Sequence, residues 1–269
     1  MGIVTMIISG GTIVSSLLAD RLIHKFGTAA VTVTSVFLTA VALVGFSFAN
    51  KFWMLLVLGI PYGLGAGAID AALNNYVALH YSSRHMSWLH CFWGVGTIVS
   101  PFVMSYALTN ATWNDGYLIV GILQSAIGVI LLVTVPVWKK TGHEAMQSTG
   151  QKAIGLFGAL KIKGVPFLLL GFLCYCAAES TAMNWASTYF VEVKHIAEAQ
   201  AAQFASLFYI GMTVGRFLSG FIAGKLGDRR LILLGTCIAA VGIVVLFLPF
   251  DVPALALAAF IVVGLGCAP

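Results

Sequence analysis

Nine long apolar runs occupy most of the 269 residues of this chain. They lie at about residues 1–19, 29–49, 52–79, 86–108, 117–137, 165–190, 203–224, 231–249 and 253–269. A helix of roughly 20 apolar residues crosses the hydrocarbon core of a bilayer, where lipid offers the backbone no hydrogen-bond partners. Since the runs also lack the period of two that membrane strands show, we predict an all-α, polytopic membrane protein.

The composition argues against a soluble globular domain. Hydrophobic residues make up 60% of the chain, charged residues only 9%, and the mean hydropathy is +0.99. Soluble domains carry about 25% charged residues, so lipid has to cover most of this surface. The five cysteines lie inside apolar runs without the spacing of a zinc site or a redox pair, and we expect free thiols, no metal and no cofactor.

Motifs of soluble enzymes are missing from the sequence. It contains no phosphate-binding G-x-x-x-x-G-K-[ST], no H-E-x-x-H and no G-x-S-x-G. We therefore expect no enzymatic activity and no direct use of ATP. The net charge of +5 is explained by the placement of its cations at one membrane surface, and we expect no nucleic-acid partner.

Lys and Arg are distributed unevenly between the two ends of the apolar runs. One side holds most of the 14, namely Arg21, Lys25, Arg84, Lys139, Lys140, Lys152, Lys161, Lys163, Lys225, Arg229 and Arg230. The other side holds Lys51 and Lys194, and Arg216 lies within a run. Basic loops remain in the cytoplasm, so the rich side is predicted to be cytoplasmic, in a protein of the cell membrane. The first run then enters from outside, the last stops within apolar sequence, and we expect further helices at both ends.

A shift of 200 residues aligns two parts of the chain. Matching positions are Gly11, Val14, Leu18, Lys25 and Gly27 with Gly211, Val214, Leu218, Lys225 and Gly227; one residue out of register, 63–65 matches 264–266. Both copies cross the membrane in the same direction, as in transporters built from two parallel repeats. The stripe of Gly211, Gly215 and Ser219 favours close helix packing, either static or mobile.

The most polar stretch lies between the two copies, at 138–164. We predict a cytoplasmic linker there, with a short amphipathic helix at 153–160 in the membrane surface. The linker separates an N-terminal bundle at 1–137 from a C-terminal bundle at 165–269.

Two loops carry a family resemblance. Residues 16–21 read SLLADR and are followed by Lys25 and Gly27, while residues 225–230 read KLGDRR. The pattern resembles the signature loop of the major facilitator superfamily, although Ser16 replaces its first glycine. Gly94, Gly96 and Pro101 are similar to the pattern of the family's fifth helix. The resemblance implies two pseudo-symmetric six-helix bundles, incomplete here as helices two to ten of twelve, and is nearest to fucose-permease-like sugar transporters.

The resemblance also implies a conformational gate in these loops. Its residues are Asp20, Arg21, Lys25, Lys225, Asp228 and Arg229. A carboxylate at a helix end can accept hydrogen bonds from the N-terminus of a neighbouring helix, and such contacts can hold one state of a bundle pair. The alternative is that these charges only anchor the topology.

Charged side chains inside membrane spans are costly, which makes them candidates for functional sites. Asp70, Glu179 and Arg216 lie within the runs, and Asn74 shares a helix face with Asp70. Further candidates for substrate binding or coupling are His90, Trp93, Trp185 and Tyr189. Burial moves the titration of a carboxyl toward physiological pH, so Glu179 or Asp70 could carry a proton. Arg216 could instead neutralise an acid, and the His90 and aromatic side chains could be packed.

These features favour a secondary transporter of a small solute, a sugar, that works by alternating access coupled to a proton or another ion. We expect a monomer in the lipid bilayer. The alternatives are efflux of drug-like or amphiphilic compounds, a non-transporting receptor and an inactive fragment. An intramembrane enzyme is disfavoured because no metal-ligand or nucleophile-base spacing is present.

Overall fold

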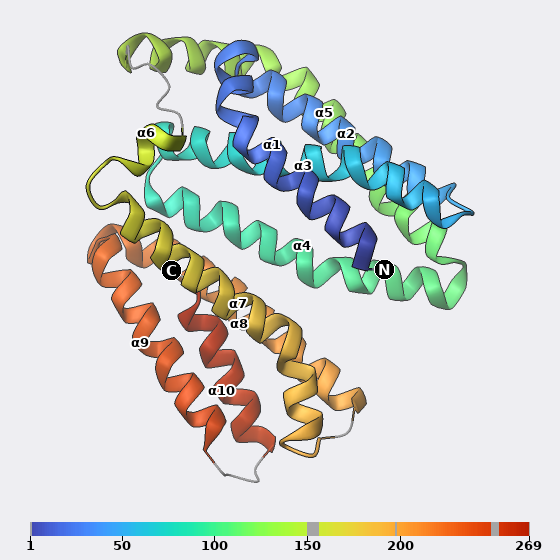
Figure 1. Ribbon diagram of the computed structural model, residues 1–269, viewed down its shortest axis with the longest axis vertical. Helices are drawn as coiled ribbons and strands as arrows, with labels where there is room; N and C mark the ends of the chain where they lie inside the picture. Colours follow the sequence, from blue (N-terminus) through green and yellow to red (C-terminus); the bar gives the residue numbers. More distant parts are fainter. Residues whose placement is uncertain (1, 150–155, 197, 249–252, 269) are drawn as a thin grey trace. The chain divides into compact units, whose positions relative to one another are not determined.

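The computed structural model describes residues 2–149, 156–196, 198–248 and 253–268, and throughout these ranges the regular structure is helical (Figure 1). The helices are α1 (Gly2–Phe26), α2 (Thr28–Ser47), α3 (Phe52–His80), α4 (Ser83–Asn110), α5 (Trp113–Thr149), α6 (Leu156–Leu160), α7 (Val165–Glu192), α8 (Glu198–Leu226), α9 (Asp228–Phe247) and α10 (Pro253–Gly266). The predicted all-α fold class is confirmed.

Each of the nine apolar runs coincides with one long helix. Eight helices in the described ranges are long and apolar enough to span a membrane, while α10 is a shorter apolar helix of 14 residues. The largest boundary difference is in α5, which continues from the predicted end at 137 to Thr149. Hydropathy marks where a helix leaves the lipid, whereas the helix itself ends where hydrogen bonding ends. Of the helix predicted at 153–160, the part at 156–160 is observed as the short α6, while its position in the membrane surface stays a prediction; residues 150–155 of the linker lie outside the described residues.

The contacts divide the chain into two compact units, which are described separately. Unit 1 comprises residues 1–80 and 100–153, and unit 2 comprises residues 81–99 and 154–269. In unit 1, α3 packs against both α1 and α2, and α2 packs against α5. In unit 2, α10 packs against both α8 and α9, and α7 packs against α8. The first part of α4 belongs to unit 2, and the predicted bundle boundaries at 137 and 165 stay a prediction.

The two units repeat the same close helix contacts. A Cβ atom placed on Gly11 would lie 3.1 Å from the backbone nitrogen of Leu64, and one placed on Gly211 would lie 3.2 Å from that of Leu265. The contact of Gly11 with Leu64 in unit 1 thus corresponds to the contact of Gly211 with Leu265 in unit 2, at the offset found in the sequence. The contact between α3 and α2 in unit 1 also matches the contact between α10 and α9 in unit 2. Gly65 of α3 faces the carbonyl of Ser35, and Gly266 of α10 faces the carbonyl of Gly235. The internal repeat is thus a repeat of backbone packing through glycine.

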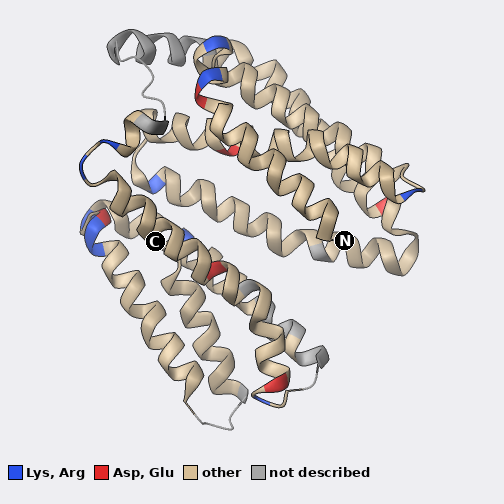
Figure 2. Ribbon diagram, in the orientation of Figure 1, with Lys and Arg blue, Asp and Glu red and all other residues tan. Residues whose placement is uncertain are grey.

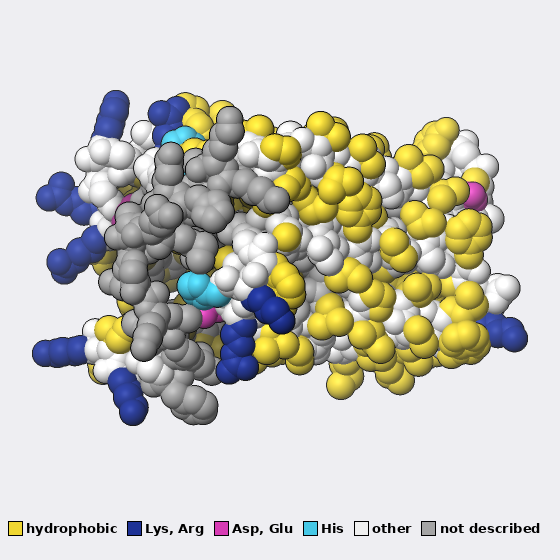
Figure 3. Space-filling view, turned by 90° about the horizontal axis from the view of Figure 1, so that it is seen from above, with side chains coloured by type: hydrophobic (Ala, Val, Ile, Leu, Met, Phe, Trp, Pro, Cys, Tyr) yellow, Lys and Arg dark blue, Asp and Glu magenta, His cyan; other side chains and the backbone are white. Residues whose placement is uncertain are grey.

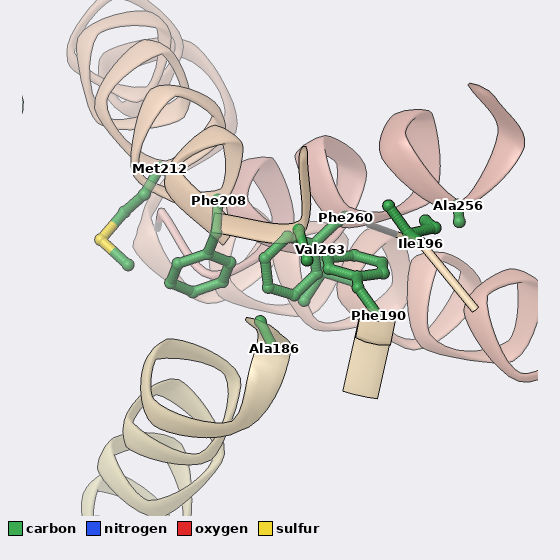
Figure 4. Close-up of a cluster of buried hydrophobic side chains, with 9 residues drawn as sticks. Ala186, Phe190, Ile196, Phe208, Met212, Ala256, Phe260 and Val263 are labelled. Carbon is green, nitrogen blue, oxygen red and sulfur yellow. The ribbon is translucent and has the colours of Figure 1, made fainter. Parts of the chain in front are cut away.

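The core of unit 2 is built around three phenylalanine rings from three helices (Figure 4). Phe260 of α10 contacts Phe190 of α7 edge-on and Phe208 of α8, with ring centroids 5.4 Å apart in both pairs. Ala186 and Val263 complete the layer. In unit 1, the buried cluster is made of smaller side chains, which lets α1 and α3 approach closely.

The outer surfaces of the helices are apolar. Phe92 is 75% exposed and Phe167 is 80% exposed, which would be unfavourable in water but is suited to lipid. Figure 3 shows hydrophobic side chains along the helices, with Lys and Arg at their ends. In each unit the cations gather at helix ends, as Figure 2 shows at the α1–α2 and α8–α9 turns. This surface is that of a multi-pass membrane protein.

Asn114 of α5 caps the end of α2. Its side-chain amide donates to the carbonyl of Ser47 at 3.0 Å and lies within 3.5 Å of the carbonyl oxygens of Phe46 and Ala49. The last carbonyl groups of a helix have no partner within that helix. One side chain therefore satisfies a helix end that the backbone leaves open.

We expect Asn114→Ala to destabilise unit 1 by about 2 kcal/mol, because several half-buried carbonyls lose their donor. Thermal unfolding of the purified protein in detergent measures the effect. The control is Asn110→Ala, since the Asn110 amide is exposed and donates to Tyr106 of its own helix. An equal change in both variants would contradict the capping role.

Candidate functional site

Two charged side chains lie in the middle of the apolar helices of unit 2. Glu179 of α7 and Arg216 of α8 are both half-buried. The two charges act electrostatically on the same neighbours, the Tyr175 hydroxyl and the Cys267 thiol. Tyr175 also donates a hydrogen bond to the Cys267 carbonyl at 2.9 Å, which joins α7 to the end of α10. Three helices therefore meet at this pair of charges.

Glu179 and Arg216 do not form a direct ion pair in the part of the chain that the structure describes. The guanidinium instead contacts α4, where its Cζ atom lies 5.3 Å from the centroid of the Trp93 ring. The guanidinium also acts on the thiol of Cys91, two residues before Trp93 on α4. Arg216 is thus stabilised by an aromatic ring on one side while a carboxylate remains nearby on the other.

Side-chain contacts between α4 and α8 surround this pair. The Thr213 hydroxyl lies against Gly94, where a Cβ atom would overlap it, and the Cys91 thiol donates to the Thr213 carbonyl at 3.6 Å. Further along the two helices, the Trp88 indole occupies the space beside Gly220. Glycines at 94 and 220 thus leave room for the Thr213 and Trp88 side chains on either side of the contact between Trp93 and Arg216.

Unit 1 contains the second predicted polar pair. The Asn74 amide donates to the Asp70 carboxylate at 3.1 Å, so the two side chains share a face of α3 as predicted. Asp70 is exposed, whereas the Asn74 carbonyl oxygen is buried without a partner among the described residues. One turn before Asp70, the Ser16 hydroxyl donates to the Gly67 carbonyl at 3.2 Å and fixes α1 against α3.

The remaining candidates lie at different places in unit 2. Trp185 is 64% exposed, whereas the Tyr189 hydroxyl donates to the Leu246 carbonyl at 2.9 Å and its ring packs on Phe247. His90 is half-buried on α4. Their roles in substrate binding stay predictions, as do those of Asp70, Asn74, Trp93, Glu179 and Arg216.

Several neighbours of the charged pair were not among the predicted site residues. They are Tyr175, Tyr209, Cys91 and Cys267. The position of Tyr175 one helical turn before Glu179 is a signal that the sequence does carry. Cys267 and Cys91 come from helices that only tertiary packing brings to the charges.

The predicted gate residues lie near the C-terminal ends of α1 and α8 and at the start of α9. Asp228 accepts a hydrogen bond from the Ser83 hydroxyl at 3.1 Å, which connects the α8–α9 turn to the start of α4 within unit 2. Asp20 lies 3.4 Å from the imidazole of His24. The cations of the set, Arg21, Lys25, Lys225 and Arg229, are exposed. The gating role of these residues stays a prediction.

Among the described residues, no three His, Cys, Asp or Glu side chains are grouped to hold a metal ion. The site consists of carboxylate, guanidinium, hydroxyl, thiol and aromatic groups. Such groups bind polar solutes and exchange protons, and the geometry supplies no nucleophile paired with a base.

Comparisons with known proteins agree with the observed fold. The sequence matches the model of the Major Facilitator Superfamily over residues 1–269. It is 25% identical over 246 residues to Bypass of stop codon protein 6 of Saccharomyces cerevisiae, covering 82% of this chain and 49% of that protein. It is 22% identical over 259 residues to the glucose/mannose transporter GlcP of Bacillus subtilis, covering 94% of this chain and 64% of that protein.

The structure resembles the E. coli fucose:proton symporter FucP with a TM-score of 0.76. Sequence identity is 17%, and the match covers 99% of this chain and 73% of that chain. This likeness shows the fold alone. The chain spans about half of the yeast relative and just under two thirds of the bacterial one. Because the family match extends over all 269 residues, the chain belongs to the major facilitator superfamily, a family of multi-pass membrane transporters rather than enzymes.

Proposed function

We propose that the protein is a secondary transporter that takes up a sugar together with a proton by alternating access. The observation that carries this proposal is the pair of Glu179 and Arg216 within the apolar span of unit 2. Holding two charges there is costly, and a structural role would be served at lower cost by apolar side chains. Charges kept in this position are typical of proton and solute pathways in membrane proteins.

The arrangement around Glu179 suits proton exchange. Its carboxylate lies near a guanidinium without being locked to it, and the Tyr175 hydroxyl lies beside both. A carboxyl in apolar surroundings can bind a proton from the outer solution and release it to the cytoplasm once the access changes sides. The same carboxylate could bind solute hydroxyl groups in the ionised state.

A sugar is supported by the kinds of side chain present and by a relative. Sugars combine hydroxyl groups with apolar ring faces, so they suit sites with amide and carboxylate groups beside aromatic rings. Within unit 2, Glu179 offers a carboxylate and Trp185 offers an exposed aromatic ring on the same helix. One curated relative is named a glucose/mannose transporter.

Alternating access is supported by the repeat of packing in the two units. Two bundles with the same internal contacts can move as rigid bodies, which is how many transporters expose a site to either side. The hydrogen bond from Ser83 to Asp228 lies at a helix turn and can form in one state and break in another.

Addition of sugar to lightly buffered cells that express the protein tests the proposal. For at least one of fucose, glucose and mannose we expect alkalinisation of the medium and accumulation of the labelled sugar, both abolished by a protonophore. Cells with the empty vector are the control. Sugar entry without any pH change would contradict proton coupling, and the absence of entry for a broad panel of sugars would contradict the substrate class.

A further inference from the structure

Trp93 and Arg216 form a contact that the packing of their helices enforces. The ring centroid and the guanidinium carbon are 5.3 Å apart, and the residues beside Trp93 on α4 contact the same turn of α8 through Thr213. Because Gly94 has no side chain, the Thr213 side chain fits directly against its backbone. The ring is therefore placed beside the guanidinium by the contacts that its neighbours Cys91 and Gly94 make with Thr213.

An aromatic ring stabilises a cation without adding a negative charge. In an apolar span, a guanidinium needs such stabilisation, and the usual source is a carboxylate in direct contact. Here the ring contact is present and the ion pair with Glu179 is absent among the described residues. The ring contact and an ion pair with Glu179 are thus two alternative ways to stabilise the Arg216 guanidinium.

Other titratable groups also face the two charges. From α7 these are Tyr175 and Cys176, from α8 Tyr209, from α10 Cys267, and from α4 Cys91. All five are neutral at physiological pH in their ordinary range. Among the groups named here, Arg216 alone carries a positive charge.

We propose that Trp93 is a positioning residue, whose ring holds the Arg216 guanidinium near Glu179 but out of ion-pair contact. The inference rests on the proposed function and changes the role of Trp93 from a stacking surface for the sugar to a support for Arg216. Without the ring, the guanidinium turns to Glu179 and keeps its carboxylate ionised. Proton-coupled uptake then fails, while exchange of sugar without net proton movement continues.

Two substitutions of similar bulk separate this role from simple packing. Trp93→Phe keeps an aromatic face, and Trp93→Leu keeps apolar volume without one. We expect Trp93→Leu to lower proton-driven uptake about tenfold and to leave sugar counterflow within about twofold of wild type, because leucine fills the space but has no aromatic face to stabilise the cation. Trp93→Phe should recover most of the driven uptake. The matched control is Phe92→Leu, because Phe92 is 75% exposed on the same helix.

A spectroscopic measurement tests the same contact without transport. The infrared band of the protonated Glu179 carboxyl is identified by its loss in Glu179→Gln. We expect this band to be weaker at the same pH in Trp93→Leu and to stay close to wild type in Trp93→Phe, because a guanidinium in contact with the carboxylate favours its ionised form.

An unchanged intensity of the carboxyl band in Trp93→Leu would overturn the inference. So would a raised KM with equal losses of driven uptake and counterflow, which would show that Trp93 binds the sugar directly. Failure of the proposed function has a different signature, because the wild-type protein itself would then show no sugar-stimulated alkalinisation.

Discussion

Replacement of Glu179 by Gln is expected to abolish proton-driven sugar uptake, with a loss of at least about 100-fold, while sugar counterflow is retained. Glutamine keeps the size and the hydrogen-bonding groups of the side chain but cannot exchange a proton. Glu179 lies in the apolar span next to Arg216, where a titratable carboxyl is costly to keep unless it is used. Uptake against a gradient and exchange at equal concentrations separate the two activities.

The matched control for this experiment is Glu192→Gln. Glu192 is exposed at the C-terminal end of the same helix, so its replacement makes the same chemical change outside the apolar span. We expect near wild-type uptake for this variant. Unchanged driven uptake in Glu179→Gln would remove the proton role from Glu179. Equal loss of driven uptake and counterflow would assign it to sugar binding instead.

The second large effect is expected for Gly63→Ala, which should lower the stability of unit 1 by about 3 kcal/mol. A Cβ atom on Gly63 would overlap the carbonyl oxygen of Ile8 and lie 3.0 Å from its carbonyl carbon. Main-chain atoms of α1 cannot move aside as a flexible side chain can, so α1 and α3 have to separate. The loss is measured by thermal unfolding in detergent.

Gly10→Ala is the control, because a Cβ atom on Gly10 meets no atom within 4 Å. The same replacement raises helix propensity by about 1 kcal/mol, so the two variants are expected to change stability in opposite directions. The repeat makes an equivalent prediction for unit 2. Gly264→Ala is expected to destabilise unit 2, because the added Cβ atom would overlap the carbonyl oxygen of Phe208. Gly224→Ala is not expected to do so, because a Cβ atom there meets no atom within 4 Å. Equal behaviour of all four variants would contradict glycine-mediated packing.

Helix positions could be predicted closely from the apolar runs. In lipid, a main-chain group can pair only within its own helix, so each run forms its helix independently of its neighbours. The repeat at an offset of 200 residues also anticipated the matching contacts of Gly11 and Gly211. Helix ends outside the lipid were less predictable. Hydropathy does not show where a helix terminates, and α5 continues beyond its apolar part to Thr149.

The candidate site was predicted only in part. Asp70, Glu179 and Arg216 stand out because a charge is conspicuous in an apolar run, and the bond between Asp70 and Asn74 follows from their spacing of four residues. Cys267 and Cys91 have no such local signal. Their proximity to the charges depends on how α10 and α4 pack against α8.

The sequence by itself determined the class of the molecule and the course of its helices, because hydropathy and backbone pairing in lipid are properties of short segments. The tertiary structure alone decided which side chains meet. Trp93 reaches Arg216, and Glu179 forms no ion pair with Arg216 among the described residues, because of the way α4, α7 and α8 come together. Contacts between distant helices depend on three-dimensional packing, and no single segment carries that information.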